Sequence, residues 1–393
     1  MASNDIPDRR RGGGDRVLPR VWNRRDIYPL ADRQALSPSE AAIEGARVLV
    51  TGGAGFVGSN LVLALQASRA DEIVVVDNLL SADRATLVDR ATFVEGSIAD
   101  DSVLDRVGVD FDCVFHLATY HGNQSSIADP LADHANNLIT TLKLFERLKN
   151  APRLRKFVYA ASGCALAPHT FTDVEAVRED GPVPLDLDSP YQISKVVGEF
   201  YAVYYHHQHG LPTVRARFQN VYGPREVLGA GQWRGTPATV WRNVVPTFVY
   251  RGLRGWPLIL DNGGRASRDF IYVADIVQGL VRCATRGVPG DVYNLASGVE
   301  TTILELAQAV VRLTGNGSPI EVGSPREWDR SGRRFGSTEK ARTTLDFVAS
   351  TSLAVGLRET VAWTRAHRTT VDRCIAAHAA RLPADSLPAD FAA

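Results

Sequence analysis

The chain has 393 residues and equal numbers of basic and acidic side chains, 44 of each, so its formal net charge is zero. This balance gives no support for a nucleic-acid partner or for an acidic binding surface. No apolar run approaches the ~20 residues that span a bilayer, and the four scattered cysteines show no metal-ligand spacing. A reduced, cytoplasmic protein without a metal site or a membrane segment is therefore expected.

The first 44 residues are rich in Arg, Asp, Gly and Pro, with Arg9-Arg10-Arg11-Gly12-Gly13-Gly14 at their centre. Such a composition cannot bury enough apolar surface to offset the entropy of ordering. Residues 1–44 are therefore expected to form a flexible arm. The alternative is a basic arm that folds over a partner subunit or an anionic ligand. No apolar segment follows the arginines, so no signal peptide is expected.

A dinucleotide-binding pattern begins the ordered part of the chain. The apolar run Arg47–Thr51 is typical of a buried parallel strand, and Gly53-Ala54-Gly55-Phe56-Val57-Gly58 follows it before a helical stretch. Glycines in this context allow a tight turn and a close approach of the backbone to a diphosphate. A second strand, Ile73–Val76, ends at Asp77, whose carboxylate suits an adenosine ribose and would repel a 2′-phosphate. The pattern predicts NAD rather than NADP; the alternative is that Asp77 only caps its strand.

Strand and helix patterns alternate up to about residue 219. Further strand candidates are Thr92–Val94, Cys113–Leu117, Lys156–Tyr159 and Thr213–Arg217, and the clearest helical stretches are 131–149 and 190–209. The alternation predicts an α/β fold with a Rossmann-type doubly wound parallel sheet. Ligands bind outside the carboxyl ends of the strands in such sheets, which places Ala118 and Ser162 near the cofactor.

Pro190 marks the start of a helix that carries Tyr191 and Lys195 four residues apart, on one face. A Lys ammonium beside a phenol favours the phenolate and lowers its pKa towards neutrality. The pair is therefore a candidate general base. The alternative is an ordinary Tyr and Lys on a solvated helix.

The pattern changes at Asn220, and Gly, Pro, Trp and Arg dominate up to Trp241. Such a long loop is typical of a lid or a binding loop, and its aromatic and Arg side chains suit a planar base and phosphates; a purely structural loop is the alternative. Phe270–Val273 is expected to return to the main sheet. Thr301–Leu313 is a predicted helix, and the stretch from Leu353 to about residue 380 should hold one or two more.

We accordingly predict two lobes. Residues 45–219 with about 266–287 form an NAD-binding lobe. Residues 220–265 with about 288–380 form a smaller C-terminal lobe that binds the substrate, and residues 381–393 are a frayed tail.

From about Ala46 to Thr364 these motifs together resemble the extended short-chain dehydrogenase/reductases, specifically the NAD-dependent nucleotide-sugar epimerase/dehydratase group. The resemblance implies a set of cofactor-binding residues: Gly52, Gly55, Phe56, Val57, Gly58, Asp77, Asn78, Ser97, Ile98, Leu117, Ala118, Tyr191 and Lys195. It implies contacts to the substrate's diphosphate from Asn220, Arg225, Arg268 and Arg326. Ser97 stands where the family often has an Asp near the adenine. Asn137 matches a structural Asn, and His116 is interpreted as a packed, hydrogen-bonded core residue.

The resemblance also implies a chemistry. Tyr191, as a phenolate, removes a proton from a sugar hydroxyl while a hydride passes from that carbon to the nicotinamide; Lys195 binds the cofactor ribose and Ser162 shares the hydroxyl's hydrogen bond. Gly163 and Cys164 stand where related 4,6-dehydratases carry an acid pair and related decarboxylases a Glu. A 4-epimerase that works through a transient 4-keto sugar is therefore the leading hypothesis.

Three alternatives stay open. Cys164 sits where GDP-mannose 3,5-epimerases carry an acid/base thiol, although no Lys between Lys195 and Lys340 supplies its usual partner; Cys164 as a small packing residue is the simpler interpretation. A dehydratase or reductase is the second alternative, and an NAD-binding sensor without turnover is the third. The stretches 131–149 and 190–209 match helices that pair in relatives, which implies a homodimer.

Overall fold

The computed structural model describes residues 42–163, 170–172, 174–324, 329, 332–383, 386–387 and 391. Two predicted site residues, Cys164 and Arg326, lie outside the described residues, as do residues 1–41 of the predicted arm. Ile43 is already fully buried in the core. The core therefore includes a residue before position 45, where the NAD-binding lobe was predicted to start.

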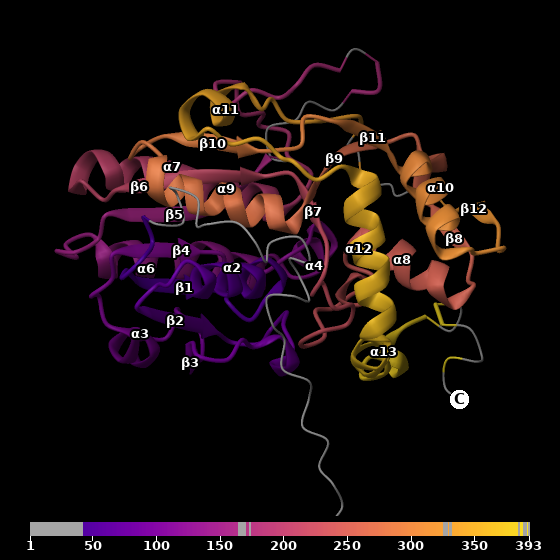
Figure 1. Ribbon diagram of the computed structural model, residues 1–393, viewed down its shortest axis with the longest axis horizontal. Helices are drawn as coiled ribbons and strands as arrows, with labels where there is room; N and C mark the ends of the chain where they lie inside the picture. Colours follow the sequence, from indigo (N-terminus) through magenta and orange to yellow (C-terminus); the bar gives the residue numbers. More distant parts are fainter. Residues whose placement is uncertain are drawn as a thin grey trace, which may run out of the picture.

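A seven-stranded, all-parallel sheet forms the centre of the molecule, in the order β10-β6-β5-β4-β1-β2-β3 (Figure 1). Its strands are β1(Arg47–Thr51), β2(Glu72–Asp77), β3(Thr92–Glu95), β4(Cys113–His116), β5(Lys156–Ser162), β6(Thr213–Phe218) and β10(Val292–Leu295). The predicted Rossmann-type fold is confirmed. The seventh strand, β10, lies in the part of the chain that we had assigned to the second lobe.

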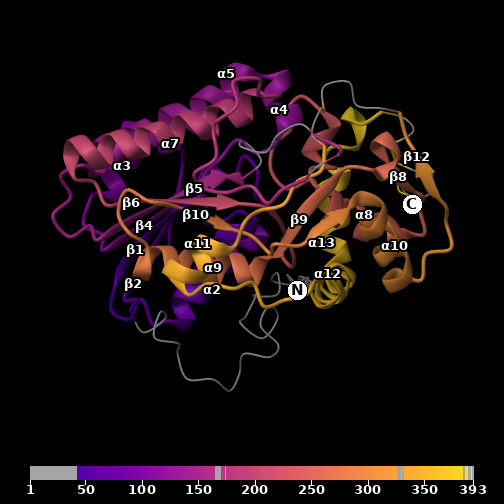
Figure 2. The same ribbon diagram turned by 90° about the horizontal axis from the view of Figure 1, so that it is seen from above.

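Helices cover both faces of this sheet because its strands are apolar on both sides. Val48 and Val50 of β1 belong to the core on one face, while Leu49 belongs to the core on the other. The first face is covered by α2(Phe56–Ala67), α9(Val273–Arg286) and α11(Glu339–Leu345), and the second by α3(Asp101–Val107), α6(Thr140–Leu148) and α7(Pro190–His209). Figure 2 shows α7, α5(Pro130–Asp133) and α4(Asn123–Ala128) on the side opposite α2 and α9.

A smaller lobe packs beside the carboxyl ends of the strands (Figures 1 and 2). It contains the sheets β11-β9-β7 and β12-β8. Its elements are β7(Asn220–Tyr222), α8(Val244–Arg254), β8(Leu258–Leu260), β9(Ser267–Tyr272), β11(Glu300–Thr302), α10(Ile303–Thr314), β12(Ile320–Val322), α12(Leu353–Ala366) and α13(Arg368–Ala376). Short 3₁₀ segments are η2(Arg84–Thr86), η5(Pro237–Thr239), η6(Asp261–Gly264) and η7(Ala379–Arg381).

One strand assignment from the sequence was wrong. Phe270–Val273 was expected in the main sheet, but β9 pairs with β7 and β11 in the smaller lobe. Every residue of β9 is buried, so its apolar run indicates a buried strand without indicating which sheet it joins. Across the part of the chain that the structure describes, no helix combines the length and the apolar character needed to cross a membrane.

Candidate active site

A cavity of about 630 Å³ opens at the carboxyl ends of the parallel strands, where the two lobes meet. Its wall contains most of the residues that the sequence predicted: Gly52, Gly55, Phe56, Val57, Gly58, Asp77, Asn78, Ser97, Ile98, Leu117, Ala118, Ser162, Tyr191, Lys195, Asn220 and Arg268. The fold thus brings the predicted cofactor, catalytic and substrate residues to one site. A volume of this size is in the ordinary range for cofactor and ligand sites.

The glycine-rich turn after β1 forms a cradle for an anion. Gly52 has φ +74°, and a Cβ there would lie 2.7 Å from the backbone nitrogen of Ala118, so only glycine allows the loops after β1 and β4 to meet. Helix α2 starts directly after the turn, with no side-chain cap and no acidic residue in its first turn. Its free N–H groups and dipole favour a negative charge. These residues fit the diphosphate of a dinucleotide.

Asp77 is hydrogen-bonded at the end of β2 and also lines the cavity. Its Oδ2 accepts a hydrogen bond from the backbone N–H of Ala54 at 3.0 Å and its Oδ1 accepts one from Leu79 at 2.8 Å. Burial raises the pKa of this carboxyl. Because Asp77 also lines the cavity, one carboxyl group joins the end of β2 to the glycine turn and faces the ligand space.

Strand β5 and helix α7 place three of the four predicted catalytic residues, Ser162, Tyr191 and Lys195, on the same wall of the cavity. Ser162 ends β5 and is 7% exposed. Lys195, one turn after Tyr191 on α7, is 4% exposed and donates a hydrogen bond to the carbonyl of Ala160 at 3.0 Å. Its Nζ lies 5.9 Å from the centroid of the Tyr191 ring. A buried cation beside a phenol ring favours the charged phenolate over the neutral form.

Asn137 fixes the start of α7 against the loop after β4. It lies in the π-helical turn η3(His134–Ile139), which connects α5 to α6. Its side-chain oxygen accepts a hydrogen bond from the N–H of Tyr120 at 2.6 Å, and its amide nitrogen donates to Ser194 Oγ at 3.2 Å. The predicted structural role of Asn137 is confirmed, and π-helical turns are frequent at functional sites.

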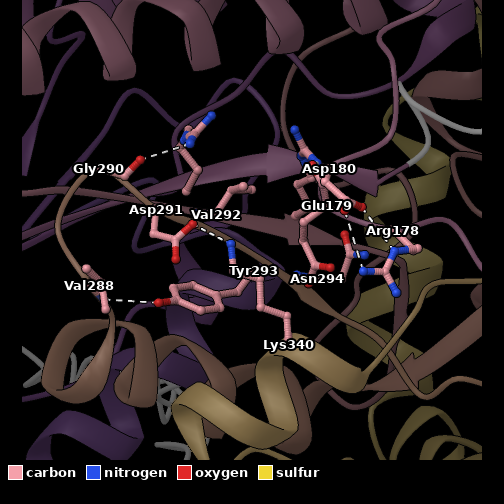
Figure 3. A network of polar contacts seen from close by, with 12 residues as sticks. Arg178, Glu179, Asp180, Val288, Gly290, Asp291, Val292, Tyr293, Asn294 and Lys340 are labelled. Carbon is pink, nitrogen blue, oxygen red and sulfur yellow. Dashed lines mark hydrogen bonds and ion pairs between the residues drawn. The ribbon is translucent and has the colours of Figure 1, made fainter.

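The chain that leads into α7 is tied to the edge of the main sheet. Glu179 Oε1 accepts a hydrogen bond from the N–H of Asn294 on β10 at 2.8 Å, and Arg217 on β6 donates to the Glu179 carbonyl at 3.0 Å. Figure 3 shows Glu179 beside Asn294 in this network. Arg217 also forms a buried ion pair at 2.8 Å with Glu199, which lies on α7 one turn after Lys195. Helix α7 and the segment that leads into it are therefore each tied to the main sheet.

Arg225 and His116 are buried, and their side chains hydrogen-bond to other parts of the fold. Arg225 is 1% exposed and does not line the cavity. Its Nε donates to Ser59 Oγ at 3.0 Å and its Nη2 donates to the carbonyl of Thr86, so it joins the segment after β7 to α2, and the expected diphosphate contact does not fit this position. His116 is buried between Thr51 and Thr141, to which its ring nitrogens are hydrogen-bonded at 2.7 and 2.9 Å. Its interpretation as a core residue is confirmed.

Comparison with known proteins gives the family. The model of the NAD dependent epimerase/dehydratase family matches residues 48–296. This chain belongs to that family. NAD is the cofactor, as Asp77 and the glycine turn predicted, and solved relatives hold NAD+ or NADH.

The relatives of this chain do not all catalyse the same reaction. The Bordetella bronchiseptica enzyme WbmF, solved with NAD+ and UDP, is 53% identical, with a TM-score of 0.78 over 87% of this chain and 99% of WbmF. UDP-glucose 4-epimerase of Mycolicibacterium smegmatis is 31% identical over 81% of this chain and 98% of its own length. A dTDP-glucose 4,6-dehydratase of Streptomyces niveus is 29% identical over 82% of this chain and 94% of its own.

The cavity wall also contains residues that were not predicted as site residues from the sequence, among them His121, Glu226 and Arg242. The His121 ring lies 6.0 Å from that of Tyr191, and burial with the nearby charges of Arg234 and Arg242 lowers its pKa to about 3, so it is neutral. Burial raises the pKa of Glu226 to about 7. His121 lies only three residues after Ala118, so extending the strand-end argument would have found it. Glu226 had no sequence signal of its own, and for Arg242 there was only the general expectation that arginines of this stretch suit phosphates.

Proposed function

We propose that the protein is an NAD-dependent nucleotide-sugar epimerase that inverts carbon 4 through a transient 4-keto sugar. The observation that carries this proposal is the wall beside Ser162. The next residue is Gly163, and a Cβ there would lie 2.8 Å from the Cδ of Gln219. Gly163 supplies none of the acidic side chains that related dehydratases and decarboxylases place here, and the flexible end of the Gln219 side chain occupies that space.

The proposed reaction assigns one task to each catalytic side chain. Tyr191 takes the proton of the 4-hydroxyl and later returns it to the same oxygen, which suits a phenolate stabilised by Lys195. Ser162 donates a hydrogen bond to that oxygen and holds it beside Tyr191. When bound, NAD accepts the hydride from carbon 4 and returns it to the opposite face after the keto sugar has turned over. No proton needs to leave another sugar carbon, so no further acid or base is required.

The proposed substrate carries a nucleoside diphosphate, with uridine as the leading base. WbmF was solved with UDP, and the Mycolicibacterium relative is a UDP-glucose 4-epimerase. Asn220 and Arg268 line the cavity and are the proposed contacts to the substrate's diphosphate. Cys164 and Arg326 keep their predicted roles as hypotheses, the first as an alternative acid/base group and the second as a diphosphate contact.

The test is incubation of the purified holoenzyme with UDP-, GDP-, dTDP- and ADP-sugars, with the products identified by NMR. The expected product is the 4-epimer of a UDP-sugar. The Lys195→Ala protein is the control, because it removes the cation beside Tyr191. A 4-keto-6-deoxy sugar, a pentose product or inversion at carbons 3 and 5 would overturn the proposal, as would NAD binding without turnover of any sugar in the panel.

We also propose a homodimer built on α5 and α7. Leu131 is 81% exposed, and Ile193 and Phe200, seven residues apart on α7, are 49% and 57% exposed. Large apolar side chains on one exposed face are typical of protein interfaces. Light scattering should give a dimer mass for the wild type and for Val322→Glu, a change at an exposed site on β12, and a monomer mass for Phe200→Glu. A monomeric wild type at micromolar concentration would remove this proposal.

A reducing, cytoplasmic location is proposed on the evidence of the thiols. The described cysteines Cys113, Cys283 and Cys374 are all buried and free. Buried free thiols are typical of proteins from reducing compartments.

A further inference from the structure

The segment Glu226–Arg242, here called the roof segment, is a packed part of the fold. Four of its side chains lie in a separate hydrophobic core with α13: Val227, Leu228, Ala230 and Val240 pack with Val371, Cys374 and Ile375. Its backbone is also joined to the loop after β2, because the N–H of Gln232 donates to the carbonyl of Leu80 at 3.0 Å. The roof segment therefore holds its polar side chains in fixed positions.

Arg234 of the roof segment bridges the loops after β2 and β4, and Arg242 also contacts the loop after β2. Arg234 Nη1 donates to Ser81 Oγ at 2.6 Å and to the carbonyl of His121 at 3.3 Å. Arg242 Nη1 donates to the carbonyl of Ser81 at 3.0 Å, and Arg242 itself lines the cavity. Ser81 follows β2 and His121 follows β4. One guanidinium is thus within hydrogen-bond distance of both loops.

The strand order determines what lies beneath this bridge. β1 is the strand between β4 and β2, so the glycine turn after β1 and the start of α2 lie between the two bridged loops. A dinucleotide's diphosphate sits at that turn and at that helix end. Arg242 lines the same cavity as the glycine turn and the first residues of α2, whereas Arg234 is not part of the cavity wall.

Among the described residues the charge of the pair is only partly balanced, by the nearby carboxyl group of Glu226 beside Arg242 and by the ring of Tyr120, whose centroid lies 5.9 Å from the Arg234 guanidinium carbon. Arg234 is 4% exposed, and its Nε and Nη2 have no hydrogen-bond partner; the same holds for the buried Nε of Arg242. In the described part of the chain no carboxylate forms an ion pair with either arginine, and the nearby Glu226 accepts a hydrogen bond from Asn243. Burial and the charge of Arg242 lower the pKa of Arg234 to about 9. Buried cations are costly unless an anion pairs with them.

We propose that Arg242, supported from behind by Arg234, binds the diphosphate of NAD on the side opposite α2. Arg242 Nη1 and Nη2 each donate one N–H to a backbone carbonyl, that of Ser81 at 3.0 Å and that of Ala230 at 2.6 Å. Each nitrogen keeps a second N–H, and such donors in a planar fork match phosphate oxygens. The diphosphate is then held between the start of α2 and the roof segment. Such a clamp keeps the cofactor in place between the two hydride steps of a turnover, when its loss would leave a keto sugar behind.

The test measures NAD affinity directly. Arg242→Gln removes the charge and keeps much of the side chain's length; NAD bound after purification and the Kd for added NAD, by calorimetry on cofactor-stripped protein, are compared with wild type. Loss of one charged hydrogen-bond donor should weaken NAD binding about 10- to 100-fold. Arg242→Lys, which keeps the charge but loses the fork, should give an intermediate loss. Arg342→Gln, at an exposed ion pair with Glu339, is the matched control and should bind NAD as wild type does.

The same variants distinguish the cofactor's diphosphate from an anion of the substrate. The Kd values for UDP and UDP-glucuronate, measured with NAD bound, should stay within about twofold of wild type in Arg242→Gln. Unchanged NAD affinity with weakened UDP or UDP-glucuronate binding would assign the arginines to the substrate and overturn the proposal, and unchanged affinity for all three ligands would also overturn it. Because the readout is cofactor binding, it does not depend on which sugar is turned over. If Arg242→Gln does not fold, Arg242→Lys alone decides, since wild-type NAD affinity in that variant contradicts a fork-shaped contact.

Discussion

Replacing Tyr191 by Phe removes a single oxygen from the proposed catalytic centre. The ring that packs against His121 at 6.0 Å is retained, and the hydrogen bond from the Tyr191 backbone to Ser126 Oγ at 3.1 Å does not involve the side chain. The free energy of unfolding should therefore change by less than about 1 kcal/mol. Bound NAD should also be retained, because the glycine turn and Asp77 are untouched.

The catalytic effect of the same change should be much larger. A general acid/base contributes roughly 10²- to 10⁴-fold to a rate, which is about 3 to 5 kcal/mol of activation free energy. The assay is the rate of 4-epimer formation by NMR, with NAD content and thermal unfolding measured on the same preparations. Tyr204→Phe, an exposed tyrosine of the same helix, is the control and should remain fully active. A Tyr191→Phe protein with more than about a tenth of wild-type activity would contradict the assignment of Tyr191 as the proton acceptor.

Three further predictions test the glycine turn and two buried residues, Glu199 and His116, that support the site. A Cβ at Gly58 would lie 2.7 Å from the backbone of the preceding turn, so the Gly58→Ala protein should purify with little NAD. Gly317→Ala is the control, because the space around Gly317 is open, and it should keep its NAD. Equal NAD contents in the two variants would contradict this prediction. Glu199→Gln should lower the free energy of unfolding by about 3 to 5 kcal/mol in denaturant titrations, because it leaves the buried Arg217 without its partner; a loss below about 1 kcal/mol would mean that the ion pair is unimportant. Burial lowers the pKa of His116 to about 3. Its contribution to stability is therefore complete above its ordinary pKa of about 6.5 and falls by up to about 1.4 kcal/mol per pH unit between pH 6.5 and 3. His116→Gln should flatten the pH dependence of the unfolding free energy in that window, and an unchanged slope would contradict the buried, neutral state of His116.

Local patterns predicted the cofactor side of the site well, because its residues are close together in sequence. The run Arg47–Thr51, the glycine turn and Asp77 form one strand–turn–helix–strand unit, so their contacts follow from chain order. Pro190 predicted the start of α7, which begins at that residue. The same reasoning placed Ser162 at the end of its strand.

The substrate side depends on contacts between distant segments, and there the sequence was a weaker guide. Arg225 follows a recognisable motif, but its guanidinium turns to α2 and is buried there. Conversely, Arg242 lies in a loop without periodic pattern, and only the packing of that loop on α13 brings it to Ser81. The return strand β10 has four residues and no distinctive boundary, so its place in the main sheet could not be read from the pattern.

The central claim is that carbon 4 loses its hydride and receives it again. Turnover of a UDP-sugar that carries deuterium at carbon 4, followed by mass spectrometry and NMR of the product, tests this directly. The proposed epimerase should return the deuterium to carbon 4 of an inverted sugar that has kept all its carbons and oxygens. Deuterium at carbon 6 of a 4-keto-6-deoxy product would show that the enzyme is a dehydratase and would contradict the proposal.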